Sequence, residues 1–194
     1  MILLFDTSAV AKPKSYNKPY TDTFNWPRMI HISWLMYNDE GHLVVDEDHL
    51  IKNFANEISD DMLRFHRLDP EKIANEGSDI KDVLLKFKAD VDRADMIFSF
   101  NLAFNESIVG AEFVRHGISH RLHDSEKYCL MQESTYFCKL DGGDGRYKWP
   151  TLSELHTICF GGAYPNPNNA RSDAMAATKC FNELLSRGEL DDIF

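Results

Sequence analysis

The chain has 194 residues, of which 43% are hydrophobic and 27% are charged, values typical of one soluble globular domain with a core of its own. Its net charge of −10 argues against a protein that holds nucleic acid by bulk electrostatic attraction, but not against an enzyme that meets phosphates through metal ions. No apolar run approaches the roughly 18 residues that cross a bilayer, and the N-terminus lacks the basic region of a signal peptide. No membrane contact is therefore expected. The cysteines form no CxxC pair, so we expect reduced thiols in a cytoplasmic protein rather than a zinc site.

The first half of the chain alternates apolar runs with turns, a pattern typical of strands. Ile2–Ala9 starts with four apolar residues and continues into Asp6, Thr7 and Ser8, which predicts a strand buried on both faces with polar side chains at its C-terminal end. A loop with several aromatic residues follows at 12–27. Strands are predicted at 29–37 and 43–51, joined by a turn, so that the second strand is antiparallel to its neighbours.

The second half of the chain is mainly helical. Helices are predicted at 59–65, from 69, from 78, at 101–116, at 151–160 behind a capping box, and at 169–187, with strands at 95–99 and 127–131, a glycine-rich loop at 140–148 and a frayed tail at 189–194. This order predicts a single α/β domain over residues 1–194 with a mixed five-stranded sheet in the spatial order 3-2-1-4-5. In that order the first strand is central, and its end meets the end of strand four and the last helix.

Four segments of the chain resemble the motifs of the DEDDh 3′–5′ exonucleases, a family that includes the proofreading subunit of bacterial replicative polymerase and ribonuclease T. The segments are Phe5–Thr7, Asn101–Asn105, Trp149–Leu155 and Asp173–Phe181, in the family's order and spacing. The resemblance implies a ribonuclease H-like fold and an enzyme that acts on single-stranded DNA or RNA ends. It also implies four carboxylates that hold two Mg²⁺ or Mn²⁺ ions, and a histidine that takes the proton from the attacking water.

The sequence departs from this family pattern at three positions. Asp6 and Asp173 match two of the four carboxylates, whereas Ser8 and Asn105 stand at the other two positions and Asn168 replaces the histidine. Because charge count is a main determinant of affinity for hard cations, the resemblance implies one weakly bound Mg²⁺ or Mn²⁺ ion at Asp6 and Asp173, or none. Loss of the general base alone costs about 10²–10⁴ in rate. We therefore expect a weak or absent nuclease.

Further residues of the matching segments are implied to face the substrate. They are Thr7, Phe100, Asn101 and Phe104, together with His66, which falls where family members carry a histidine after a short helix. Phe100 stands where the family often has a histidine. Phe100 and Phe104 are candidates to stack on a base, although core packing is favoured for Phe104. Packing is also the expectation for Trp149.

Two functions follow from these residues. The first is a 3′–5′ exonuclease-like protein with weak or lost activity, and the second is a non-enzymatic pseudonuclease that binds nucleic acid or a protein partner. The acidic charge favours a protein partner or a small nucleotide. Two residues are candidates to compensate for the lost groups. Arg171 could neutralise the aspartates, although a surface arginine is favoured, and Glu106 could supply a carboxylate, although on a helix it points about 100° away from Asn105.

Overall fold

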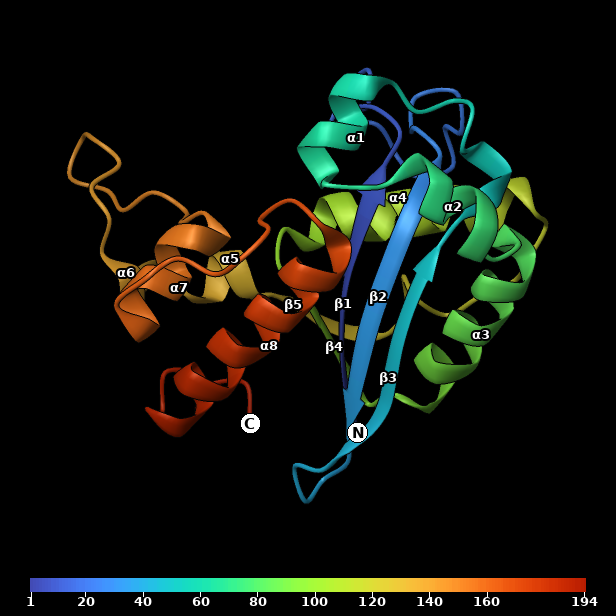
Figure 1. Ribbon diagram of the computed structural model, residues 1–194. Coiled ribbons are helices and arrows are strands. Elements are labelled where there is room, and N and C mark those ends of the chain that lie inside the picture. Colours follow the sequence, from blue (N-terminus) through green and yellow to red (C-terminus); the bar gives the residue numbers. More distant parts are fainter.

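The computed structural model describes residues 1–194 and contains a five-stranded sheet with helices on both faces (Figure 1). The strands are β1 (Ile2–Ala9), β2 (Met29–Tyr37), β3 (Leu43–Leu50), β4 (Met96–Ser99) and β5 (Glu126–Cys129), in the order β3-β2-β1-β4-β5. Strand β2 is antiparallel to β1 and β3, whereas β4 is parallel to β1 and β5. The predicted α/β class, strand order and antiparallel second strand are confirmed.

Helices cover the two faces of the sheet unequally. They are η1 (Lys52–Phe54), α1 (Asp60–His66), α2 (Pro70–Glu76), α3 (Ile80–Arg93), α4 (Leu102–Arg115), α5 (Leu130–Glu133), α6 (Thr135–Cys138), α7 (Leu152–Phe160) and α8 (Ala170–Ser186). The residues of α3 and α4 share the larger hydrophobic core, and those of α7 and α8 share the smaller one (Figure 1). None of the helices combines the length and apolar character needed to cross a membrane.

The alternation of side chains along β1 decides which polar group meets which helix. Leu3 and Phe5 belong to the larger core and Leu4 to the smaller one. Because successive side chains of a strand point to opposite faces, Asp6 lies on the α8 side and Thr7 on the α4 side. The end of the central strand therefore presents polar groups to two helices at once.

The structure corrects the sequence prediction in two places. The predicted strand 127–131 ends at Cys129, and Leu130 instead begins α5, where it is buried and its carbonyl accepts a hydrogen bond from the Ser134 hydroxyl. The tail 189–194 is not frayed at its start, since Leu190 is only 2% exposed within the smaller core. The apolar side chains of the acidic tail provide the physical reason for this packing, since Leu190 lies in the smaller core and Ile193 packs against it.

Candidate functional site

A cleft of about 890 Å³ opens at the C-terminal end of β1, between α1, the start of α4, the start of α7 and the start of α8. It is lined by nine of the site residues predicted from the sequence, namely Asp6, Thr7, His66, Phe100, Asn101, Phe104, Asn105, Asn168 and Asp173. Ser8, the tenth predicted residue, does not line it. Segments separated by more than 150 residues in the sequence thus meet at one place.

Asp6 and Asp173 form a pair of carboxyl groups in the floor of the cleft. Asp6 is 8% exposed, and burial together with the nearby Asp173 raises its pKa well above the ordinary value. Asp173 lies in the first turn of α8, where its Oδ1 accepts hydrogen bonds from the Tyr164 hydroxyl at 2.7 Å and the Asn168 backbone N–H at 3.1 Å. Burial raises the pKa of Asp173 to about 6. The pair therefore favours protons more strongly than ordinary aspartates do.

Asn105 joins this pair through a fully engaged side-chain amide. Its Nδ2 donates to Asp6 Oδ2 at 3.0 Å, to Ser99 Oγ at 2.8 Å and to the Phe100 carbonyl at 2.9 Å. Its Oδ1 accepts from the backbone N–H of Thr7 at 3.1 Å and from the Thr7 hydroxyl at 2.6 Å. A backbone N–H can only donate and a carbonyl can only accept, so these two groups fix the orientation of the amide. Asn105 thus presents a donor, not an oxygen ligand, to Asp6.

Ser8 makes a structural contact instead of facing the cleft. Its side chain is 1% exposed, and its Oγ accepts a hydrogen bond from the backbone N–H of Ala170 at 3.2 Å. That N–H belongs to the first turn of α8, whose free donors need acceptors. The serine thereby fixes the start of α8 against β1, in the place where the family motif has a carboxylate.

Asn168 stands where the resembled family has its histidine, and its backbone contacts the side chain of His66. Asn168 has φ +70°, and its carbonyl oxygen lies 2.6 Å from Nδ1 of His66. The other ring nitrogen of His66, Nε2, lies 3.1 Å from the carbonyl oxygen of Ala9. Burial lowers the pKa of His66. Both ring nitrogens are directed at backbone carbonyl oxygens and not at a water in the cleft, so His66 is not placed to supply the missing general base.

The residues of the cleft do not fit the pair of hard cations implied by the resemblance. Bridging two such ions needs several carboxylates with open oxygen lone pairs. Here only Asp6 and Asp173 supply carboxylates, and Asp6 already accepts an N–H from Asn105. No group of three or more His, Cys, Asp or Glu side chains is close enough to hold a metal ion.

Neither candidate for compensation reaches the aspartate pair. Arg171 pairs with Asp46 on β3, with Nη2 at 3.1 Å from Asp46 Oδ2. Glu106 pairs with His123 and with Lys127, the latter at 2.6 Å, on the side of α4 away from Asn105. Both charges are thus used to fix neighbouring elements together.

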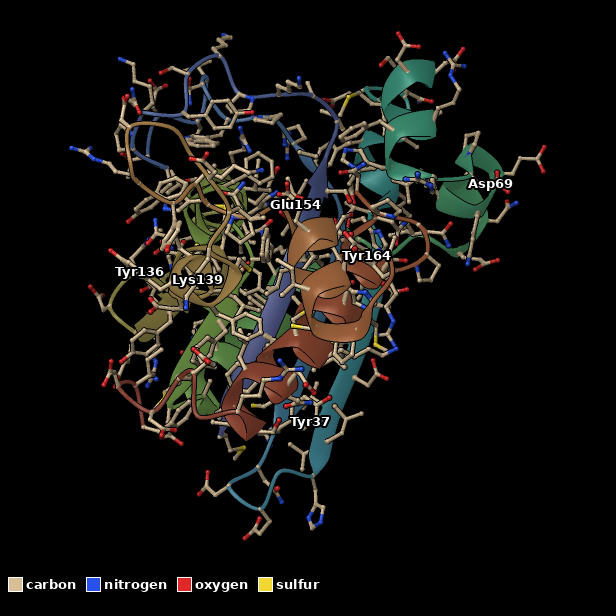
Figure 2. All side chains as sticks on the ribbon, turned by 90° about the vertical axis from the view of Figure 1, so that its left-hand side faces the viewer. Tyr37, Asp69, Tyr136, Lys139, Glu154 and Tyr164 are labelled. Atoms are coloured by element: carbon tan, nitrogen blue, oxygen red, sulfur yellow. The ribbon has the colours of Figure 1, made fainter.

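Among the lining residues that sequence reasoning missed, four have polar or exposed aromatic side chains at the cleft, namely Lys12, Tyr16, Trp149 and Tyr164. Tyr164 donates to Asp173, and burial and that carboxylate raise the pKa of its hydroxyl. Lys12 and Tyr16 come from the loop before β2, and Trp149 is 58% exposed rather than packed (Figure 2 shows the neighbouring start of α7 at Glu154). The interleaving of lysines with an aromatic residue at 12–18 is the signal that could have indicated the loop.

Replacing Asp173 with asparagine is expected to raise the free energy of unfolding by about 1 kcal/mol near pH 7.5 and to change it little near pH 4.5. The raised pKa means that the native state holds its proton more tightly than the unfolded state. The stability from this group is therefore present below pH 4 or so and is lost as the pH rises through about 6. The full shift corresponds to about 3 kcal/mol, which partial exposure and the loss of a favourable charge in the first turn of α8 reduce. Urea denaturation of both proteins at the two pH values provides the measurement, and a loss of stability near pH 7.5 would contradict this explanation.

The fold is similar to that of solved exonuclease structures. No family model and no curated protein sequence matches the chain. Among solved structures, the chain is similar to E. coli exonuclease I in complex with a dT13 oligonucleotide, with a TM-score of 0.74 and 15% identity over 99% of this chain and 42% of that one. It therefore spans about two fifths of the length of exonuclease I.

Two smaller nucleases show the same likeness. A 3′-exonuclease that recognises the 3′ end of the histone mRNA stem-loop has a TM-score of 0.69 at 12% identity, over 96% of this chain and 82% of that one. Cell-death related nuclease 4 has a TM-score of 0.69 at 10% identity, over 96% of this chain and 64% of that one. These likenesses establish an exonuclease-like fold.

Proposed function

We propose that this protein is a non-catalytic exonuclease-like domain that binds a single-stranded nucleic-acid end in its cleft. The observation that carries the loss of catalysis is the orientation of the Asn105 amide, whose N–H is donated to Asp6. In an exonuclease of the resembled family, the Asp6 oxygen that accepts this N–H would face a metal ion. Here a hydrogen bond within the protein uses it instead.

Four features support an inactive site. Ser8 bonds the start of α8, Asn105 donates to Asp6, both ring nitrogens of His66 face backbone carbonyls, and the two remaining aspartates favour protons. A two-metal mechanism requires charge to neutralise the scissile phosphate and a base to activate water. Replacement of the metal ligands and of the base acts against both requirements at once.

The lining of the cleft supports a ligand with flat apolar rings. Phe65, Phe100, Phe104, Tyr16 and Trp149 contribute aromatic side chains to its walls. Every nucleobase has a face that stacks on such rings, and stacking contributes about 1–3 kcal/mol per base without regard to sequence. Lys12 and the unpartnered amide of Asn101 add polar contacts at the cleft.

The test is a nuclease assay on 5′-labelled single-stranded DNA and RNA with Mg²⁺ and then with Mn²⁺. The control is the double variant Asp6→Ala/Asp173→Ala, which removes both remaining family carboxylates. We expect the wild-type protein to release no more nucleotide than this control. Cleavage that disappears in the double variant would make the protein an enzyme and would overturn the proposal.

Calorimetric titration with Mn²⁺ measures directly whether the aspartate pair binds a metal ion. A pair of aspartates holds at most one weakly bound ion, so we expect no heat of binding below the millimolar range. Tight binding of two ions would contradict the assignment of Asn105 as a hydrogen-bond donor. The same titration of Asp173→Asn identifies any residual heat that comes from elsewhere on the acidic surface.

A further inference from the structure

Two exposed segments flank the cleft and interleave aromatic with basic side chains. The N-terminal rim is residues 12–18, with Lys12, Lys14, Tyr16 and Lys18. The C-terminal rim is residues 136–149, with Tyr136, Lys139, Arg146, Tyr147, Lys148 and Trp149. Lys12 and Tyr16 of one rim and Trp149 of the other line the same cleft. The rims are therefore continuous with it.

The aromatic rings of both rims are turned to solvent. Tyr136 is 77%, Tyr16 62%, Trp149 58% and Tyr147 45% exposed. The rings of Tyr136 and Tyr147 approach edge to face with centroids 6.0 Å apart, and that of Tyr16 lies 6.4 Å from Phe104 inside the cleft. Figure 2 shows Tyr136 and Lys139 at the outer side of the molecule, away from the sheet. Exposed rings in such number are costly for a monomer unless they contact something.

The charge of the rims differs from that of the rest of the chain. The N-terminal rim has three lysines and no acidic residue, and the C-terminal rim has three basic and two acidic residues, in a chain of net charge −10. Five of the six cations make no ion pair, namely Lys12, Lys14, Lys18, Lys139 and Arg146, whereas Lys148 bonds Glu154 at 2.6 Å. Free cations beside exposed rings match a partner that alternates phosphates with bases.

We propose that the two rims form a binding track for single-stranded nucleic acid outside the cleft, with Trp149 and Tyr16 as the stacking residues nearest its mouth. The track rests on the proposed function, because it extends the same ligand from the cleft onto the surface. A protein partner would need an apolar patch, but the unpaired cations lie between the rings of the rims. A small nucleotide would fill the cleft without reaching Tyr136 and Tyr147.

The tryptophans of the chain provide a direct readout. Trp26 and Trp34 are 4% and 0% exposed, whereas Trp149 is 58% exposed. Quenching of the emission by acrylamide therefore reports mainly on Trp149. We expect addition of an oligodeoxythymidylate in EDTA to quench the Trp149 emission. The Trp149 emission that remains is expected to be protected from quenching by acrylamide. The absence of divalent metal separates this binding from any catalytic site.

Fluorescence anisotropy of a fluorescein-labelled oligodeoxythymidylate then tests the individual residues. Trp149→Ala and Tyr16→Ala are each expected to weaken binding by at least about five-fold, and Trp149→Phe to retain most of it, because stacking needs only a ring. Phe24→Ala is the matched control, since Phe24 is 88% exposed but lies on neither rim. Circular dichroism of each variant checks that the protein is folded.

The salt dependence tests the cations. Three to five phosphate contacts predict a slope of log K against log salt of about −2 to −3.5 for a single strand. Lys14→Glu is expected to weaken binding and to make this slope shallower, whereas Lys81→Glu on α3 is the control and leaves both unchanged.

The possible outcomes bear differently on the track and on the proposed function. Binding that is unaffected by the rim variants, or a mononucleotide that competes as well as the oligonucleotide, overturns the track and leaves a ligand confined to the cleft. An inactive protein with no oligonucleotide binding overturns both the track and the cleft binding of the proposed function, and leaves only the loss of activity. Cleavage with Mn²⁺ overturns the proposed function, while binding in EDTA that depends on Trp149 still supports the track.

Discussion

Replacing Asn105 with aspartate is expected to lower the free energy of unfolding by about 2–4 kcal/mol near pH 7.5, although the change restores a carboxylate of the resembled motif. The two N–H hydrogens of the amide Nδ2 are shared among three acceptors, Asp6, Ser99 and the Phe100 carbonyl. A carboxylate donates to none of these groups and places a third carboxyl group beside Asp6 and Asp173. Asn105 is 2% exposed, so water cannot relieve the loss.

The sign of the pH dependence follows from the burial of the new group. Burial beside Asp6 raises its folded pKa above the unfolded value of about 3.9. Its contribution to stability is then fully present below the unfolded pKa and is lost as the pH rises through the folded value. The deficit relative to wild type is therefore smaller near pH 4.5 than near pH 7.5, as urea denaturation at both values measures.

A matched control lies four residues earlier in the same cleft. Asn101 is exposed at the start of α4, and its side chain makes no capping bond. Asn101→Asp is therefore expected to change the free energy of unfolding by no more than about 0.5 kcal/mol. If Asn105→Asp were as stable as wild type, or if Mn²⁺ alone restored its stability, the site would be ready to accept metal and the proposal of a non-catalytic domain would fail.

The strand order was predictable from the sequence because each strand has a local signal. The apolar run of β1, the turn at 38–41 and the short apolar segment at Met96–Ser99 each indicate a strand without knowledge of distant contacts. The end of β5 was not predictable, since Leu130 fits a strand or a helix equally well and only packing decides. The tail was missed for the same reason, because burial of Leu190 depends on α8 and the smaller core.

For the candidate site, the sequence predicts which residues come together but not how their side chains are oriented. The sequence predicts which residues meet in the cleft, because the carboxyl end of a central strand is where an open α/β sheet places its chemistry. The direction of the Asn105 amide could not be predicted, since it depends on an N–H of Thr7 and a carbonyl of Phe100 that approach only in the folded chain. The exposure of Trp149 was missed because tryptophan is highly buried on average.

A buried ion network holds the loop that carries the N-terminal rim. Glu112 of α4 is 0% exposed and accepts hydrogen bonds from Arg28 at 2.9 and 3.0 Å, from Arg115 at 2.9 Å and from the Met29 backbone N–H at 3.1 Å. Arg115 also donates to the Thr23 carbonyl at 2.6 Å. The carboxylate thus joins α4 to both the loop and the start of β2.

Replacing Glu112 with alanine is expected to lower the free energy of unfolding by about 3–5 kcal/mol, because removing one partner leaves buried charge without compensation. Glu76→Ala is the control, since Glu76 forms only an exposed pair with Lys72 at 3.9 Å and such pairs contribute about 0.3–0.5 kcal/mol. Urea denaturation of the two variants beside wild type measures both changes.

The same substitution connects stability to the cleft. If the network positions the loop, Glu112→Ala loosens the loop backbone and makes the Lys14–Ser15 bond susceptible to trypsin at denaturant concentrations where the core is still folded, whereas Lys12 and Lys18 precede prolines and are not cleaved. The variant also weakens oligonucleotide binding through loss of the N-terminal rim. Gly110, two residues before Glu112 on α4, limits repair by repacking. A Cβ there would lie 2.7 Å from Nε2 of His123 and 2.9 Å from the Tyr20 ring, so α4 and the loop are already as close as they can be. A variant that loses less than about 1 kcal/mol and keeps its resistance to trypsin would show that the loop is held by the packing of Tyr20 and Trp26 instead.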